Sequence, residues 1–377
     1  MKKIKVLQVC YSLKTAGIET YVLNLQRNIN SNEFEVHFLV YKNSANDLFY
    51  KKEIEKLGGI VEIADSKENN FLLKHIIRRI NYCKILKENS FDVIHIHASC
   101  GLQGIEVFLA HLMGTKNIII HSHSSNLARS SKFNTLKHLL HKKGLVWIKK
   151  YSKYKIACSE KAAQWLYPNQ HNVKIIANGI KCSAYRFDVI TRETVRTNLN
   201  LKQDTLVIGH IGSFSEIKNH SFLIDIFKNY QTINPDSVLI LIGDGKLKYS
   251  IYEKVKNSGL ENTVIFMGLR TDCNLLLQAM DIFVFPSYWE GMPLALLEAQ
   301  ASGLHCLASD TITHQVNLTN NVKFLNLTSS PSEWCTHIIK TPLSKRKNMA
   351  NLLSNLGYDI ETTSSEIQSI YHTLANS

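Results

Sequence analysis

Short apolar runs alternate with amphipathic stretches through the first half of the chain. Residues 4–9 and 34–40 are apolar and rich in β-branched side chains, which is typical of strands covered on both faces. Between them, apolar residues recur at helical spacing. This alternation predicts βα units and a parallel sheet. Further strands are expected at 60–63, 93–96, 117–120, 155–157 and 173–176, and a helix at 71–86.

The same pattern restarts at residues 206–211, after a polar stretch at 181–203 that we interpret as a linker and the entry to a second domain. Two Rossmann-like, doubly wound α/β domains are therefore predicted, 1–182 and 183–359, facing across a cleft. A helix within 360–377 is expected to complete the first domain. In such folds, ligands bind at the carboxyl ends of the strands. Strands of the second domain are expected at 238–241, 264–266, 282–285, 305–308 and 322–325.

Composition restricts the class of protein. The chain has 377 residues, 45% of them apolar and 20% charged, as in globular proteins. No stretch approaches the roughly 20 apolar residues of a membrane span, and the eight cysteines have no metal-binding spacing. We expect a cytoplasmic protein with reduced thiols.

Charge is unevenly distributed. Residues 1–180 carry 27 Lys and Arg against 13 Asp and Glu, a net +14, whereas residues 181–377 carry 17 against 18, a net −1. A one-sided positive charge indicates a polyanionic partner or an anionic surface.

The stretch 281–303 contains a pair of glutamates. A buried strand ends at Pro286, Pro293 suits the first turn of a helix, and Gly303 can end that helix in a left-handed cap. Glu290 is then expected in a loop at the carboxyl end of a strand, and Glu298 one to two turns into the helix. Such a pair is common by chance, so its position is what indicates a site.

His121 and His123 end a predicted strand in the first half. Residues two apart in an extended chain point the same way, so both imidazoles can face one ligand as hydrogen-bond partners or as acid and base. A metal site is the rival interpretation, but no carboxylate lies nearby. Satisfied strand-end histidines are the plainer alternative, and it is favoured for His95 and His97.

Three further loops follow strands. Gly17 opens a helix, where backbone amides suit a phosphate. Ser213 and Lys218 follow the first strand of the second half, and they can supply donors and charge to a leaving diphosphate. Gly243 lies in a tight turn after the next strand. Each signal alone is weak.

Together these residues resemble the GT-B fold glycosyltransferases of family 4, which transfer sugars from nucleotide donors with retention of configuration. The resemblance covers most of the chain and is most specific at the family's two-glutamate motif, Glu290 to Glu298; it is strongest to the branch that builds bacterial exopolysaccharides and capsules. Other matching motifs are Ala16-Gly17-Ile18-Glu19, the strand end at His123, Asn178-Gly179-Ile180, Lys218-Asn219 and Gly243-Asp244-Gly245.

The resemblance implies a role for each candidate residue. Glu298 would bind the donor's ribose, and Lys218 would neutralise the departing diphosphate. His123, with His121 beside it, would contact the donor sugar. Neither a metal nor another cofactor is implied, and the leaving phosphate would itself take the acceptor's proton. The donor sugar and diphosphate would also be held by Glu290, Gly291, Met292, Pro293 and Leu294, with Gly17, Ser213 and Gly243 contributing to the donor site.

Some positions depart from the family pattern. Ser213 stands where an arginine that binds the diphosphate is usual. A catalytically weakened or silent nucleotide-sugar-binding protein is therefore the alternative function. A dinucleotide oxidoreductase would need a G-x-G-x-x-G turn after the first strand, which is missing, and the aromatic and basic pattern of an RNA-binding sheet is also missing.

The basic segment 129–155 mixes lysines with apolar and aromatic residues at helical spacing. A basic amphipathic helix suits an anionic membrane surface, while a core-packed helix with a solvated basic face is an equally good interpretation. In the family branch the acceptor is commonly a polyprenyl-diphosphate-linked sugar or another saccharide. A position on the inner face of the plasma membrane would then be reasonable.

Overall fold

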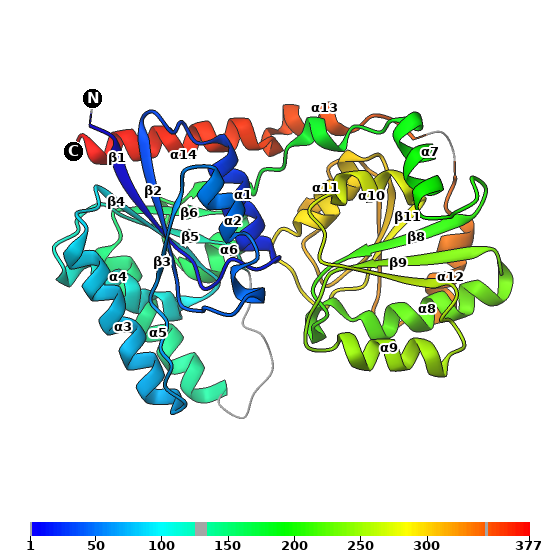
Figure 1. Cartoon of the computed structure of the whole chain (residues 1–377), viewed down its shortest axis with the longest axis horizontal. Helices are drawn as coiled ribbons and strands as arrows, with labels where there is room; N and C mark the ends of the chain where they lie inside the picture. Colours follow the sequence, from blue (N-terminus) through cyan, green and yellow to red (C-terminus); the bar gives the residue numbers. More distant parts are fainter. Residues whose placement is uncertain (1, 125–133, 344–345) are drawn as a thin grey trace. The chain divides into compact units, whose positions relative to one another are not determined.

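The computed structural model describes residues 2–124, 134–343 and 346–377. The chain divides into two compact units, which are described separately (Figure 1). The first unit comprises residues 1–179 and 360–377, and the second comprises residues 180–359.

The first unit is built on a seven-stranded parallel sheet with the order β3-β2-β1-β4-β5-β6-β7. Strand β1 lies between β2 and β4, so the direction of winding reverses there. Such a switch point opens a crevice at the carboxyl ends of the strands. The strands are β1 (Ile4–Val9), β2 (Phe34–Val40), β3 (Ile60–Ile63), β4 (Val93–Ala98), β5 (Ile118–Ser122), β6 (Tyr154–Ala157) and β7 (Lys174–Ile175).

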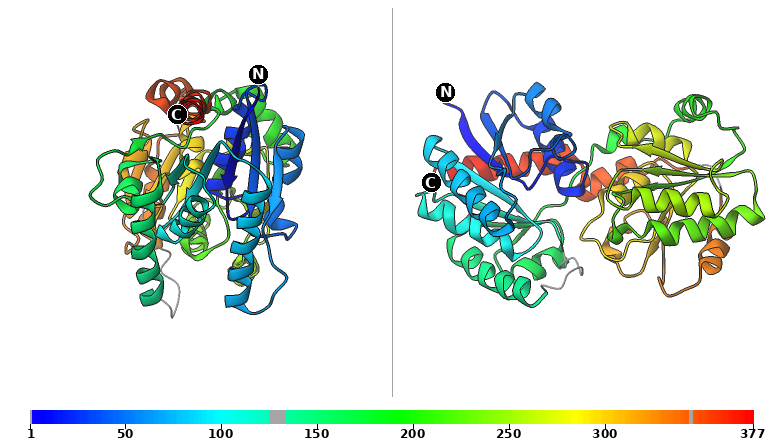
Figure 2. Two further views of the ribbon diagram at one scale, coloured as in Figure 1. Left: turned by 90° about the vertical axis from the view of Figure 1, so that its left-hand side faces the viewer. Right: turned by 60° about the horizontal axis from the view of Figure 1, so that its bottom comes forward.

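Helices form two layers on this sheet. The C-terminal helix α14 (Ile360–Ala375) packs against α1 (Gly17–Asn28) and against strands β1 and β4. Helix α4 (Gly104–Leu112) lies between α3 (Phe71–Glu88) and α5 (Asn134–Tyr151) in the other layer (Figure 2). The remaining elements are η1 (Asn46–Leu48), α2 (Lys51–Lys56), η2 (Gly101–Gln103) and α6 (Glu160–Leu166).

The second unit repeats this architecture with six parallel strands in the order β10-β9-β8-β11-β12-β13. Its switch point lies between β8 and β11. Buried residues such as Phe227, Leu239 and Trp334 form the core between this sheet and its helices. The strands are β8 (Leu206–Ile211), β9 (Ser237–Ile242), β10 (Val264–Gly268), β11 (Ile282–Phe285), β12 (His305–Ser309) and β13 (Val322–Leu325).

The helices of the second unit alternate with these strands, as βα units require. They are η3 (Cys182–Tyr185), α7 (Val189–Asn198), η4 (Glu216–Lys218), α8 (His220–Ile233), α9 (Lys248–Asn257), α10 (Cys273–Ala279), α11 (Leu294–Ala301), η5 (His314–Val316), α12 (Pro331–Lys340), α13 (Ala350–Leu353) and η6 (Ser354–Tyr358).

The interpretation of residues 181–203 as a linker was wrong. The segment contains η3 and α7, and α7 is fixed to the start of β11 by two arginines. Arg192 and Arg196 pair with the two oxygens of Asp281 at 2.6 and 2.7 Å. Arg196 is fully buried. Charged side chains that suggested a solvated linker are therefore part of the packing.

The predicted α/β fold class is confirmed. Strands β1, β2, β3, β8, β11 and β13 have the predicted bounds, and the others differ by one or two residues at one or both ends. All eight cysteines are free thiols. None of the helices in the described ranges is both long and apolar enough to span a bilayer.

Candidate functional site

Lys218 and Glu290 lie at the switch point of the second sheet. Lys218 ends η4, which follows β8, and Glu290 lies in the loop after the neighbouring strand β11. Lys218 Nζ is 2.7 Å from Glu290 Oε1, and the side chains are 17% and 18% exposed. The same Nζ lies 4.6 Å from the centre of the Phe285 ring. The two residues predicted to act on one ligand are thus ion-paired with each other.

Glu298 lies in α11 and is buried. Its Oε1 accepts a hydrogen bond of 2.8 Å from the hydroxyl of Tyr185. Burial raises the pKa of Glu298, and the Tyr185 hydrogen bond partly offsets that rise. Sequence reasoning missed Tyr185 because it lies in the supposed linker and belongs to no quoted motif.

Backbone N–H groups at the start of α11 lie at the same edge of the second sheet. Pro293 occupies the N-cap, one residue earlier than predicted, and no side chain caps the helix. Gly291, Met292 and Leu294 are buried beside it. The first amides of a helix carry partial positive charge, so this N-terminus suits an anion. Gly303 ends the helix with a φ of 72°, as predicted.

Gly243 allows two loops of this edge to touch. Its φ is 142°, and a Cβ there would lie 2.1 Å from the carbonyl oxygen of Gly212. The loops after β8 and β9 therefore pack backbone to backbone. Ser213 follows directly, and its hydroxyl lies 3.2 Å from that of Ser215. The predicted contact of Gly243 and Ser213 with a ligand stays a prediction.

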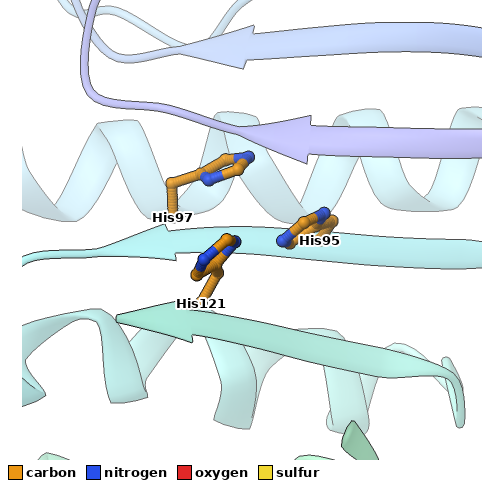
Figure 3. Close-up of side chains that lie close together, drawn as sticks. All are labelled: His95, His97 and His121. Carbon is orange, nitrogen blue, oxygen red and sulfur yellow. The ribbon is translucent and has the colours of Figure 1, made fainter. Parts of the chain in front are cut away.

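In the first unit, histidines line one face of the sheet. Gln8 of β1 is in register with His95 of β4, and His97 of β4 is in register with His121 of β5. Figure 3 shows the rings of His95, His97 and His121 gathered together on these two strands. His123 follows β5, with its ring 4.0 Å from that of His121, as the spacing predicts. Helices α1 and α14 cover this face with Tyr21 and Tyr371.

Hydrogen bonds join most of these groups. His123 Nδ1 lies 3.0 Å from Asn178 Oδ1, and His123 Nε2 lies 2.9 Å from His97 Nδ1. His97 Nε2 lies 2.7 Å from Gln8 Oε1. Burial lowers the pKa of His95 and of His123 to about 3, and the pKa values of His97 and His121 fall well below the usual range for the same reason. These rings are therefore neutral at physiological pH.

The same cluster provides nitrogens that a metal can use. Ligand atoms of His95, His97 and His121 lie within 4.8 Å of one another. Within the described part of the chain, His95 Nε2 and both nitrogens of His121 have no hydrogen-bond partner. Both nitrogens of His97 are already bonded. The expectation that no metal takes part stays a prediction.

Gly17 is the first residue of α1. A Cβ at this position would meet no heavy atom within 4 Å, so packing does not require glycine there. Glu19, two residues on, is buried and accepts a 2.8 Å hydrogen bond from the Ser12 hydroxyl. Burial raises the pKa of Glu19.

The basic segment forms helix α5, but its aromatic residues face inward. The ring of Trp147 stacks on Phe108 of α4 at 5.0 Å, and Tyr151 stacks on His111 at 4.3 Å. Residues 129–133 of the predicted basic segment, which include Arg129, Lys132 and Phe133, lie outside the described residues. On the outer surface, the exposed residues are His138, Leu139, Leu140, Lys142, Lys143, Val146, Lys149 and Lys150.

Two family models match successive parts of the chain. Residues 15–184 match glycosyltransferase family 4, and residues 191–351 match glycosyl transferases group 1. The putative glycosyltransferase EpsF of Bacillus subtilis is 29% identical, covering 98% of this chain and 96% of its own. A Staphylococcus aureus capsular polysaccharide biosynthesis glycosyltransferase, CapH, is 24% identical over 98% of both chains.

A third relative carries a specific name. It is the Escherichia coli UDP-Gal:alpha-D-GlcNAc-diphosphoundecaprenol alpha-1,3-galactosyltransferase, 26% identical over 82% of this chain and 80% of its own.

Solved structures share the fold. HepE of Anabaena, in complex with UDP and glucose, superposes with a TM-score of 0.77 at 18% identity, covering 97% of this chain and 98% of its own. Sucrose-phosphate synthase of Thermosynechococcus elongatus has a TM-score of 0.78 at 16% identity over the whole of both chains. With the two family matches and the two parallel sheets, the chain belongs to the GT-B fold glycosyltransferases of family 4.

Proposed function

We propose that this glycosyltransferase moves a hexose from a UDP-linked donor to a saccharide or polyprenyl-diphosphate-linked saccharide, with retention of configuration, in surface polysaccharide synthesis. The observation that carries the proposal is the gathering of Lys218, Glu290, Glu298 and the uncapped start of α11 at one sheet edge. A nucleoside diphosphate sugar needs a cation and amides for its phosphates and carboxylates for its hydroxyls. The named donor and acceptor of the Escherichia coli relative support the same choice.

Each group of the second unit takes one part of the donor. Glu298 accepts hydrogen bonds from the ribose hydroxyls, and Tyr185 holds that carboxylate in place at 2.8 Å. Lys218 and the amides of Gly291 to Leu294 bind the diphosphate. Because Lys218 is paired with Glu290, the diphosphate shares or takes over this cation when it binds. Glu290 then accepts hydrogen bonds from the donor sugar.

The first unit supplies neutral groups. Gly17 lets backbone approach the diphosphate, which explains a glycine that packing does not require. His123 contacts the donor sugar, and His121 packs beside it. Neutral imidazoles suit this task because a sugar hydroxyl needs directional hydrogen bonds and carries no charge.

The reaction needs no nucleophilic side chain and no metal. The bond between the anomeric carbon and the diphosphate oxygen breaks while the acceptor oxygen attacks from the same face. The acceptor's proton passes to the departing diphosphate, so charge and atoms balance. The site contributes positioning and electrostatic stabilisation of the diphosphate by Lys218 and the helix amides.

A thermal-shift screen against nucleotide sugars tests the donor, because a ligand that binds only the folded state raises its melting temperature. We expect a UDP-linked hexose to give the largest shift. Proton NMR of the transfer product then reports whether the anomeric configuration is retained. No shift with any UDP sugar contradicts the donor assignment. A shift with no transfer to any saccharide acceptor instead favours the silent binding protein that Ser213 suggests.

We also propose that α5 docks the enzyme on an anionic membrane, where a polyprenyl acceptor resides. Changing Lys142, Lys143, Lys149 and Lys150 to glutamine should reduce sedimentation with phosphatidylglycerol vesicles, because each surface lysine adds about 1 kcal/mol of attraction. The matched control changes four exposed lysines of the second unit, namely Lys228, Lys256, Lys323 and Lys340. Equal sedimentation of the two variants contradicts this role.

A further inference from the structure

A single chain of hydrogen bonds crosses the first unit and includes His123. It runs from Asn178 through His123 and His97 to Gln8, with contacts of 3.0, 2.9 and 2.7 Å. From Gln8 it continues to Tyr371 of α14 and then to His95, with two contacts of 2.7 Å. Every member is at least nine-tenths buried. The chain therefore ties four separate elements to the ring that faces the sugar in the proposed function.

The amide of Gln8 gives this chain a direction. Its Nε2 donates to Tyr371 Oη, so the phenolic hydrogen is free to point at His95 Nδ1. Its Oε1 can only accept, so the hydrogen of His97 lies on Nε2. A neutral His97 then has its lone pair on Nδ1, and the 2.9 Å contact requires that His123 Nε2 donates to it. This direction holds for the orientation in which the Gln8 amide presents Nε2 to Tyr371 and Oε1 to His97.

We propose that His97, Gln8 and Tyr371 are positioning residues that hold His123 in the tautomer with its hydrogen on Nε2. This proposal rests on the proposed function, in which His123 contacts the donor sugar. With Nε2 committed to His97, Nδ1 is the one ring nitrogen of His123 that can accept a hydrogen bond or a proton. A substrate hydroxyl that reaches this ring therefore donates to Nδ1.

Asn178 is the group that such a hydroxyl replaces. Its Oδ1 lies 3.0 Å from His123 Nδ1. Two acceptors cannot form a hydrogen bond, so the proposed tautomer requires the Asn178 amide to turn and present an N–H to the ring. The side chain can thus satisfy His123 in its neutral or its protonated form. Without the hydrogen-bond chain, both tautomers of His123 would be populated, and molecules with the hydrogen on Nδ1 would present a donor to the donating hydroxyl.

The rival explanation of the cluster is a metal ion held by His95, His97 and His121. A metal would need a lone pair from His97, and both nitrogens of that ring already have hydrogen-bond partners. Binding would therefore break the contact with Gln8 or with His123. The two accounts differ in the protonation of His97 and in metal content, and both quantities are measurable.

The direct test is nitrogen NMR of the full-length chain with labelled histidine, in which long-range proton couplings distinguish the two tautomers. Resonances are assigned by single histidine substitutions. We expect His97 and His123 both to carry the hydrogen on Nε2. The opposite tautomer at His123, or a stoichiometric metal in the purified protein, overturns the proposal. This measurement needs no substrate, so it decides the proposal even if the proposed donor proves wrong.

Two substitutions connect the tautomer to catalysis. His97→Phe keeps the size of the ring but removes the acceptor for His123, so we expect mixed tautomers at His123 and a fall in kcat of about tenfold with little change in KM. His97→Asn places an amide oxygen where Nδ1 was, so it should restore both the tautomer and most of kcat. Equal losses in the two variants, or an unchanged tautomer in His97→Phe, contradict the proposal.

A matched pair of tyrosines separates this role from general stability. Tyr371→Phe removes the hydroxyl that bonds Gln8 and His95. Tyr167→Phe removes an equally buried hydroxyl of the first unit, which donates to the carbonyls of Ile120 and Ile156. This hydroxyl takes no part in the hydrogen-bond chain that includes His123. We expect Tyr371→Phe alone to alter the His123 resonance and lower kcat. The same response in both variants indicates a purely structural role and overturns the assignment of Tyr371.

Discussion

The edges of the two sheets differ in the charge of their side chains. The edge of the second unit places Lys218, Glu290 and Glu298 around an uncapped helix start, so it is rich in charge. The corresponding part of the first unit is lined by His97, His121 and His123, which burial keeps neutral. A diphosphate requires charge compensation, whereas a sugar requires directional hydrogen bonds without charge.

The contrast extends to how each set of residues is held. Charged groups of the second unit are fixed by partners a few ångströms away, as Lys218 is by Glu290 and Glu298 by Tyr185. In the first unit, His95, His97 and His123 are held by a hydrogen-bond chain that reaches helix α14. Breaking one ion pair should therefore have a local effect, while disturbing the histidines should affect the whole first unit.

The largest expected effect is acid instability of the first unit. His95, His97, His121 and His123 are neutral in the folded state because burial lowers their pKa values, but they titrate near 6.5 when unfolded. Above pH 6.5 these histidines are neutral in both states and do not oppose folding. As the pH falls from 6.5 towards about 3, only the unfolded state binds protons at them, so the free energy of unfolding decreases. Four such groups should lose about 5 kcal/mol between pH 7 and 5.5.

The second unit provides the comparison. Burial lowers the pKa of His210 to about 3 and that of His220 to about 2. Burial also lowers the pKa values of His305 and His337, but these side chains are only partly buried, so the second unit has fewer deeply buried histidines that oppose its folding in acid. Hydrogen exchange with mass spectrometry, corrected for intrinsic rates, should show strands β1, β4 and β5 losing protection before β8 and β11. Earlier loss in the second unit would contradict this prediction.

A smaller effect is expected from removing the cation of the second unit. Lys218→Ala should lower kcat by about 100-fold to 1,000-fold, or about 3 to 4 kcal/mol, because Lys218 would stabilise charge on the leaving diphosphate. Steady-state kinetics with the preferred donor measure the change, and Lys256→Ala, an exposed lysine of α9, serves as the control. If both variants lose activity equally, Lys218 has no special role.

The smallest predicted change is a gain. Ser213 stands where the family usually has an arginine, next to the Gly212 and Gly243 contact. Ser213→Arg should tighten UDP binding about tenfold, or about 1.4 kcal/mol, because a bidentate guanidinium adds charge-assisted hydrogen bonds to a phosphate. Ser215→Arg is the positional control. Unchanged UDP affinity in Ser213→Arg would mean that residue 213 does not face the diphosphate.

Sequence patterns predicted the fold well because both sheets are buried on two faces, which produces short apolar runs with clear ends. The run 282–285 and its following helix are examples, and the pairing of Lys218 with Glu290 follows from the ends of neighbouring strands. The same reasoning failed for the polar stretch 181–203, which was predicted to be a linker but contains η3 and α7. From sequence alone, a buried arginine such as Arg196 is expected to be solvated, because its ion-pair partner Asp281 lies 85 residues away in sequence.

The histidine row could be predicted only in part. The spacing of His121 and His123 indicated that they share a face, and their rings are 4.0 Å apart. The hydrogen bonds that link His123 through His97 and Gln8 to Tyr371 depend on strand register and on a helix more than 200 residues away in sequence. Local patterns carry no information about such contacts. Tyr185 was missed for the same reason, because its partner Glu298 lies 113 residues further on.

The central claim is that the charged edge of the second unit holds the nucleotide. Calorimetric titration of UDP into the wild type, Glu298→Ala and Glu193→Ala tests it most directly, since Glu193 is an exposed glutamate of the same unit. Loss of a charged hydrogen-bond partner of the ribose should weaken binding to Glu298→Ala about 100-fold, or about 3 kcal/mol, while Glu193→Ala binds as the wild type does. Equal UDP affinity in all three folded proteins would contradict the claim.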